Sequence, residues 1–127
     1  MYSMMLVALG GALGSVARFK LSNLLMSYAM EWRFPLGTFT VNITGCFLIG
    51  VVAALAEKHQ WFTADIRVFV IAGFLGGFTT FSAFGLETFM LLKRHEIVIA
   101  VSYVSLSVVV GLFALYLGHS MVPGKNG

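Results

Sequence analysis

Charged residues are scarce in this sequence, and their scarcity decides the class of protein. They make up 10% of the 127 residues, whereas soluble domains carry roughly 25%. A chain with so few charges cannot cover a surface that faces water. Hydrophobic residues make up 59% of the sequence, and the mean hydropathy is +0.94. The composition therefore excludes a soluble globular domain and indicates an integral membrane protein.

Several kinds of site are missing as well. The one cysteine, Cys46, has no second cysteine with which to form an intrachain disulfide. The net charge of +3 is scattered without a basic run, which argues against a nucleic-acid surface. The histidines His59, His95 and His119 lie near loops or helix ends, without the spacing of metal ligands. With no phosphate loop and no Ser/His/Asp or Cys/His set at one depth, catalysis is not expected.

Four apolar segments are long enough to cross a bilayer as helices, which takes about 20 residues each. Short, charged connections separate them. Pro35 suits the start of a helix, because its missing N–H would be unpaired there anyway. We predict an all-α membrane protein with a single transmembrane domain over residues 1–127. Its spans are expected at residues 4–29, 36–56, 68–92 and 97–119.

The loop charges give no preferred orientation. Cytoplasmic loops normally carry an excess of lysine and arginine, but here each side of the membrane would receive three cations. Two more, Arg18 and Lys20, lie inside the first span. The tie permits insertion both ways up, and hence an antiparallel dimer, while the alternative is one orientation fixed by Arg18 and Lys20. The loop and terminal cations are Lys58, Arg67 and Lys125 on one side and Arg33, Lys93 and Arg94 on the other.

Small residues in the first span indicate close helix contacts. Gly10 and Gly14 are four residues apart, as are Gly11 and Ser15, and this spacing lets two helix backbones approach closely. Four helices alone form a bundle too thin to enclose much water. We therefore expect the chain to oligomerise.

The third span contains "GGFTTFSAFGLET", residues 76–88, which is poor material for a continuous apolar helix. Gly76 and Gly77 are followed by three hydroxyl residues, Thr79, Thr80 and Ser82, and we predict a helix break at this glycine pair. Broken helices are tolerated at mid-membrane only when they are buried in protein or line a cavity. Unwound carbonyls can coordinate a cation, and a half-helix N-terminus favours an anion. The alternative is a kink that only eases packing.

Polar and aromatic groups at helical spacing suggest a path through the bundle. Asn42 lies near the middle of the second span and shares a face with Thr38. On spacing alone, an interhelical hydrogen bond that only binds helices together is the favoured interpretation of Asn42. Phe81 and Phe84 lie on one face of the third span, and the electropositive edges of such rings can hold a small anion beside polar donors.

The remaining polar groups of the spans are less specific. Tyr103 and Ser107 form a stripe on the fourth span, although an intramembrane serine commonly bonds only its own backbone. Glu87 is an acid well inside a span, which makes it a candidate functional residue, although near a helix end it could reach the interface or be protonated. Arg18 could attract anions or pair with a carboxylate.

Three motifs together resemble a known family. "GGALGSVARF", "GTFTVNITGCFLIG" and "GFLGGFTTFSAFGLET" are closely similar to the Fluc (CrcB-type) bacterial fluoride channels, and the resemblance spans all four helices. It implies an antiparallel dual-topology homodimer with two fluoride pores in the inner membrane. It also implies a structural sodium ion at the dimer interface and passive export of cytoplasmic fluoride.

The resemblance assigns roles to residues by motif position. It places the pore amide at Asn42 and the anion-binding rings at Phe81 and Phe84. It implies that the main-chain carbonyls of Gly76 and Thr79, from both subunits, hold the sodium ion. The other residues of the implied anion pathway are Arg18, Thr38, Thr40, Thr80, Ser82, Glu87, Tyr103 and Ser107.

Two other functions remain open from the sequence. A small dual-topology multidrug exporter would need an acid inside its first helix, and here the ionisable groups of that span are Arg18 and Lys20. A non-transporting membrane assembly subunit would need packing motifs but no broken helix with hydroxyl groups. Fluoride flux would separate these alternatives from a channel.

Overall fold

The computed structural model describes residues 2–28 and 34–123, and every regular element within these ranges is a helix. Four helical stretches are long and apolar enough to cross a membrane, which confirms the predicted all-α class with four spans. The elements are α1 (Tyr2–Tyr28), α2 (Leu36–Lys58), α3 (Ala64–Arg67), η1 (Val68–Leu75), α4 (Gly76–Phe78), α5 (Phe81–Lys93) and α6 (Ile97–Met121).

The observed helices run a few residues beyond several of the expected span boundaries. The third span starts at Ala64 rather than residue 68, because the Thr63 hydroxyl accepts a hydrogen bond from the N–H of Ile66 at 3.4 Å and caps the helix early. The second and fourth spans run two residues further than expected, to Lys58 and Met121. Residue 29 and the cations Arg33 and Lys125, which entered the predictions, lie outside the described residues.

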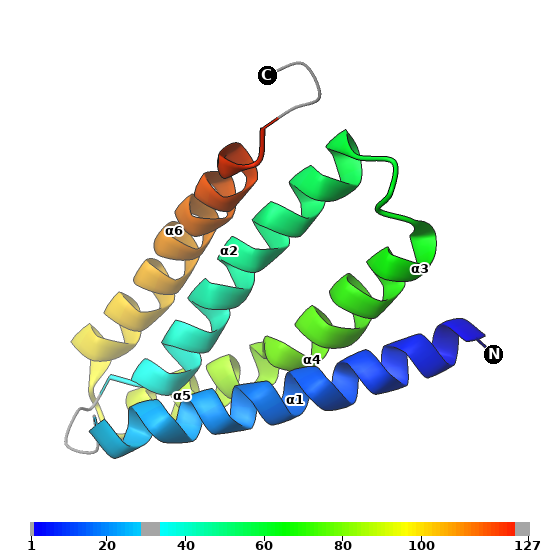
Figure 1. The fold of residues 1–127 in the computed structure, drawn as a ribbon. Coiled ribbons are helices and arrows are strands. Elements are labelled where there is room, and N and C mark those ends of the chain that lie inside the picture. The colour runs from blue at the N-terminus through cyan, green and yellow to red at the C-terminus, as the bar shows by residue number, and fades with distance from the viewer. Residues whose placement is uncertain (1, 29–33, 124–127) are drawn as a thin grey trace.

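The helices form two pairs. Helix α6 packs along α2, and α1 packs along η1 and α4. Figure 1 shows that the two pairs lie close together near α5 and diverge toward the end that carries the N-terminus and α3. The third span therefore starts beside α1 and ends, as α5, beside α6.

Glycine lets both pairs approach at backbone distance. A Cβ added to Gly14 of α1 would collide with the carbonyl oxygen of Phe74 and would lie 2.9 Å from the backbone nitrogen of Phe78. A Cβ on Gly118 of α6 would collide with the carbonyl oxygen of Phe47. The small residues of the first span thus pack against the third span.

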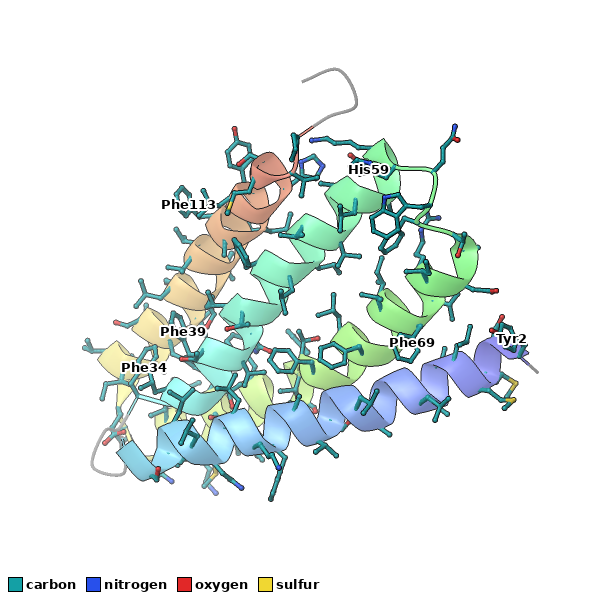
Figure 2. The ribbon with its side chains drawn as sticks, viewed as in Figure 1. Tyr2, Phe34, Phe39, His59, Phe69 and Phe113 are labelled. Carbon is teal, nitrogen blue, oxygen red and sulfur yellow. The ribbon has the colours of Figure 1, made fainter. Side chains whose placement is uncertain are left out.

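Apolar side chains cover the outside of the bundle. Phe113 is 63% exposed on α6 and points away from the other helices in Figure 2. Phe34 and Phe39 instead pack together at the start of α2, with ring centroids 5.2 Å apart. An outer surface of this kind suits contact with lipid tails.

The third span is broken near its middle, as predicted, but the break lies two residues beyond the glycine pair. Gly76 is helical, with φ −62° and ψ −39°, and α4 continues to Phe78. The break falls at Thr79 and Thr80, which are extended (φ −87°, ψ 158° and φ −149°, ψ 120°). The prediction of a break at Gly76–Gly77 was wrong, because Gly77 serves contact with α1: a Cβ on it would lie 2.6 Å from the Gly11 carbonyl oxygen.

Candidate functional site

The break is stabilised by the threonines that form it. Thr79 keeps a last helical bond to the Leu75 carbonyl oxygen, which also accepts from the Thr79 hydroxyl, at N–O and O–O distances of 3.0 and 2.9 Å. The hydroxyl of Thr80 accepts from the N–H of Ala83 at 3.2 Å and so caps the start of α5. Each half of the broken span therefore has a defined end.

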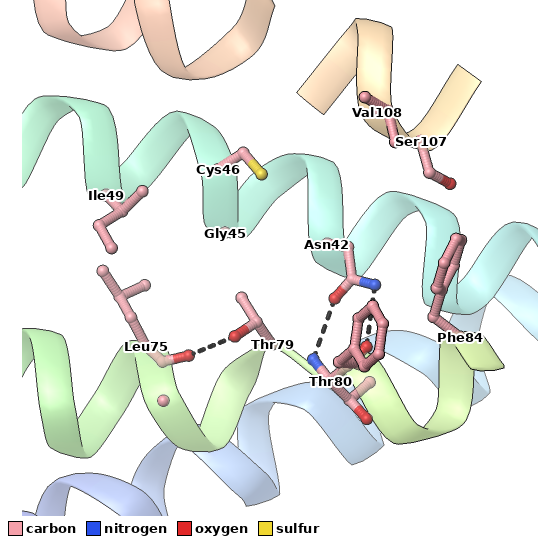
Figure 3. A pocket seen from close by; sticks show the side chains of 12 residues that line it. Asn42, Gly45, Cys46, Ile49, Leu75, Thr79, Thr80, Phe84, Ser107 and Val108 are labelled. Carbon is pink, nitrogen blue, oxygen red and sulfur yellow. Dashed lines mark hydrogen bonds between the residues drawn. The ribbon is translucent and has the colours of Figure 1, made fainter. Parts of the chain in front are cut away.

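Asn42 of α2 binds both main-chain groups of Thr80. Its Nδ2 donates to the Thr80 carbonyl oxygen at 3.1 Å, and its Oδ1 accepts from the Thr80 N–H at 3.0 Å. Both bonds are drawn in Figure 3. An amide side chain carries both a donor and an acceptor, so Asn42 can satisfy the Thr80 N–H, which has left its helical partner, and bind the Thr80 carbonyl as well. One N–H of the amide is left for a ligand.

The side-chain hydrogen bonds at the break leave two main-chain carbonyl groups without their helical N–H partners. In a continuous helix the Thr80 N–H would bind the Gly76 carbonyl, and the Ala83 N–H would bind that of Thr79. Asn42 takes the first donor and the Thr80 hydroxyl takes the second. The carbonyls of Gly76 and Thr79 are therefore without their helical partners at the edge of one groove.

The groove has a volume of about 430 Å³ and lies between α2, the third span and α6. Figure 3 shows Asn42 reaching from α2 to Thr80 of the third span, with Phe84 beside them and Ser107 on α6. Much of the remaining lining is apolar. The groove is lined by Asn42, Gly45, Cys46, Ile49, Leu75, Gly76, Thr79, Thr80, Phe81, Phe84, Ser107 and Val108.

The two phenylalanines on α5 lie next to each other at the groove. Their ring centroids are 5.8 Å apart, with the ring planes tilted by 40°. Phe81 is 83% exposed, whereas Phe84 is half-buried and packs on Tyr103 with centroids 5.0 Å apart. Phe84 is therefore held by the bundle, and the Phe81 ring projects beyond it.

A second polar group lies behind Phe84. The Thr38 hydroxyl of α2 donates to Oε1 of Glu87 at 2.5 Å, so the intramembrane acid has a partner. The hydroxyls of Tyr103 and Ser107 are buried without a hydrogen-bond partner in the described part of the chain. Predicted residues of α2, α5 and α6 thus meet on one side of the break.

Three other predicted residues lie apart from the groove. Arg18 lines a smaller pocket of about 150 Å³ with Thr38 and Thr80, and its Nε donates to the Gly77 carbonyl oxygen at 3.1 Å. Ser82 is exposed, with its hydroxyl 3.4 Å from that of Thr80. Thr40 is half-buried and lines neither pocket.

Sequence reasoning missed two features of the site. Ser22 and Asn23 of α1 line the smaller pocket, and the signal for them was the presence of two polar residues near the end of an apolar span. The π-helix η1 was also missed. Its run "VFVIAGFL" carries no sequence mark that separates it from an ordinary apolar helix.

Known proteins match nearly the whole chain. The family model described as "CrcB-like protein, Camphor Resistance (CrcB)" matches residues 5–119. A relative from Methylobacillus flagellatus, named "Fluoride-specific ion channel FluC", is 56% identical over 122 residues, 96% of this chain and 95% of the relative. Relatives of the same name from Helicobacter acinonychis and Azobacteroides pseudotrichonymphae are 46% identical (87% of both chains) and 41% identical (90% of both chains). The chain is a multi-pass membrane protein of bacteria, and it belongs to the CrcB-like family.

Proposed function

We propose that this chain forms a fluoride-selective channel, not an enzyme, that lets cytoplasmic fluoride leave passively across the bacterial inner membrane. The observation that carries the proposal is the groove at the helix break, where an amide, hydroxyl groups and two phenylalanine rings meet. Relatives over nearly the full chain are named fluoride-specific channels, which supports the same function.

The groove offers what a small, hard anion requires. Fluoride gives up water only to close hydrogen-bond donors, and a conducting site must also bind weakly enough to release the ion. The second N–H of Asn42, the Ser107 hydroxyl and the positive edges of Phe81 and Phe84 are such partners. Apolar neighbours such as Ile49 and Val108 exclude water. The hydroxyls and acid behind Phe84, from Thr38, Glu87 and Tyr103, extend this polar path.

Two copies in opposite orientations would complete the site. Phe81 is 83% exposed in one chain, and a ring on an ion path needs a second wall. The equal distribution of loop cations is compatible with insertion both ways up. An antiparallel homodimer would present two equivalent grooves and bury both Phe81 rings.

The free carbonyls at the break fit a structural sodium ion. Gly76 and Thr79 have lost the N–H groups that would occupy their oxygens in a helix, and unwound carbonyls are the usual protein ligands of sodium in broken membrane helices. One chain supplies two such oxygens, so a pair of chains would supply four. Sodium would then join the two broken helices at the centre of the dimer.

The function is tested by ion efflux from liposomes loaded with fluoride or with chloride, each with and without a proton gradient. A channel releases fluoride and retains chloride, and its rate does not depend on the proton gradient. Proton-dependent transport would indicate an exporter instead, and no flux from a folded, dimeric protein would indicate an assembly subunit.

Replacing sodium by a large organic cation during purification should abolish fluoride efflux if the sodium proposal holds.

Topology needs a separate measurement. An Arg94→Cys variant made in a Cys46→Ala background places a single thiol in the exposed turn between α5 and α6. Dual topology predicts that a membrane-impermeant thiol reagent labels about half of the molecules from each side of the membrane. Labelling from one side alone would rule out the antiparallel dimer without affecting the flux result.

A further inference from the structure

Arg18 is a cation near the middle of a membrane span. It lies three residues beyond the centre of α1 (Tyr2–Tyr28), about 4.5 Å along the helix axis, and it is half-buried. Charged side chains at this depth are rare and normally pair with another group inside the protein. The partner here is the main-chain carbonyl of Gly77, whose oxygen accepts from the Arg18 Nε–H at 3.1 Å.

The Gly77 carbonyl is available because of the break. In a continuous helix it would accept from the N–H of Phe81. Instead, α4 ends at Phe78, the chain runs extended through two threonines, and α5 begins at Phe81. Gly77 therefore lies in the last turn of a helix, where carbonyls are unpaired and the helix dipole is negative. A guanidinium group complements both properties.

Close packing of α1 and α4 brings the two groups together. A Cβ on Gly77 would lie 2.6 Å from the Gly11 carbonyl oxygen, and a Cβ on Gly14 would lie 2.9 Å from the backbone nitrogen of Phe78. Arg18 is four residues beyond Gly14, on the same face of α1. The glycine contacts thus fix the distance from Arg18 to the end of α4.

Arg18 reaches the break from the side away from the groove. It lines the smaller pocket together with Thr80, and Thr80 also lines the groove. Asn42 holds the Thr80 main chain from α2, so the break is held by one side chain on each side. We propose that Arg18 is a positioning residue, which keeps the first half of the third span ended at Phe78 by binding the Gly77 carbonyl, and that it does not bind the permeating anion.

This inference rests on the proposed channel function and predicts which kinetic quantity changes. Replacing Arg18 by Met removes both the charge and the donor, so the break loses one support. Maximal fluoride flux should fall about tenfold or more, as for the loss of a hydrogen bond to a charged group. The fluoride concentration at half-maximal flux should stay unchanged. Arg18→Lys, which keeps a cationic donor, should recover much of the flux.

The control is Lys20→Met, which removes an equal charge two residues further along α1 from an exposed side chain. It should leave both kinetic quantities unchanged. A raised half-saturating fluoride concentration in Arg18→Met, with normal maximal flux and an effect that disappears at high ionic strength, would overturn the proposal. That pattern would show that Arg18 attracts the anion.

A second measurement covers the case in which Arg18→Met does not fold. In ¹⁵N-arginine-labelled wild-type protein, the Arg18 Nε–H, assigned by its absence in Arg18→Lys, should exchange slowly with solvent because the Gly77 carbonyl binds it. Rapid exchange would overturn the proposal. Because this readout needs no transport, a wild-type protein without fluoride flux would remove the proposed function while the Arg18 result stood.

Discussion

The two halves of the third span differ in how they are held. The first half, η1 and α4, packs backbone to backbone against α1, and a Cβ on Gly73 would lie 3.0 Å from the Gly10 Cα. The second half, α5, is held by side chains, through the Thr38–Glu87 hydrogen bond and the contact of Phe84 with Tyr103. The first half is thus closely packed on its neighbour, while the second carries the exposed groups of the site.

The largest expected effect comes from the residue that joins the halves. Asn42→Asp keeps an acceptor for the Thr80 N–H but loses the donor to the Thr80 carbonyl, which by itself corresponds to roughly 1–3 kcal/mol. A carboxylate would also repel an anion in the groove. Fluoride efflux from liposomes should fall by about 100-fold or more, since the two effects add.

Thr44→Val is the matched control for Asn42→Asp. Thr44 is half-buried two residues along α2 and lines neither pocket, so its loss should leave efflux near the wild-type rate. If Asn42→Asp conducts as well as Thr44→Val, the amide lies outside the ion path.

The same substitution in each half should have opposite effects on stability. Gly77→Ala forces a Cβ to within 2.6 Å of the Gly11 carbonyl oxygen and should destabilise the fold by about 1–3 kcal/mol, as overpacking does. Gly85→Ala on α5 meets nothing within 4 Å and should stabilise the helix by about 0.5–1 kcal/mol. Thermal unfolding in detergent measures both. A destabilising Gly85→Ala would show that a second chain contacts α5 at this point.

The aromatic rings test whether the exposed half carries the selectivity. Phe81→Ile removes a positive ring edge from a side chain that is 83% exposed in one chain, so efflux should fall about two- to tenfold, as for an aromatic interaction of roughly 0.5–1.5 kcal/mol, with a smaller fall in unfolding temperature than Phe84→Ile causes. Phe84→Ile should reduce both, because Phe84 also packs on Tyr103. Phe89→Ile, on an exposed residue outside the groove, is the control. Equal efflux from all three variants would remove the rings from the mechanism.

The smallest effect is expected where α5 ends. His95 adopts φ 63°, a left-handed conformation that suits glycine, and its N–H closes the helix on the Leu92 carbonyl oxygen at 3.0 Å. His95→Gly should raise the free energy of unfolding by about 0.5 kcal/mol and leave fluoride efflux unchanged. A lower free energy of unfolding would mean that the histidine ring makes a contact worth more than the relief of the left-handed backbone conformation.

The sequence predicted the spans well because hydrophobic length is a local property. The position of the break was harder. A glycine pair signals either flexibility or close packing, and only the approach of α1 to Gly77 shows which. Thr80, followed by a helix that it caps, was the better local signal of the break.

Long-range partners could not be predicted from spacing. Asn42 is 38 residues from Thr80, and Arg18 is 59 residues from Gly77. Their residue types indicated that each needs a polar partner within the membrane, but both partners are main-chain groups, which every residue possesses. Helix packing alone selects which main-chain groups they bind.

The π-type hydrogen bonding of η1 has a consequence for how this segment tolerates insertions and deletions. Removing one residue from positions 68–75 would turn everything that follows around the helix axis, by less than the roughly 100° per residue of an α-helix because a π-helical turn holds more residues. Thr79 and Thr80 would then face a neighbouring helix or lipid, although every apolar side chain could be replaced by another of similar size. Apart from Gly73, which has no room for a Cβ, chain length is therefore a stricter constraint on this stretch than amino-acid identity.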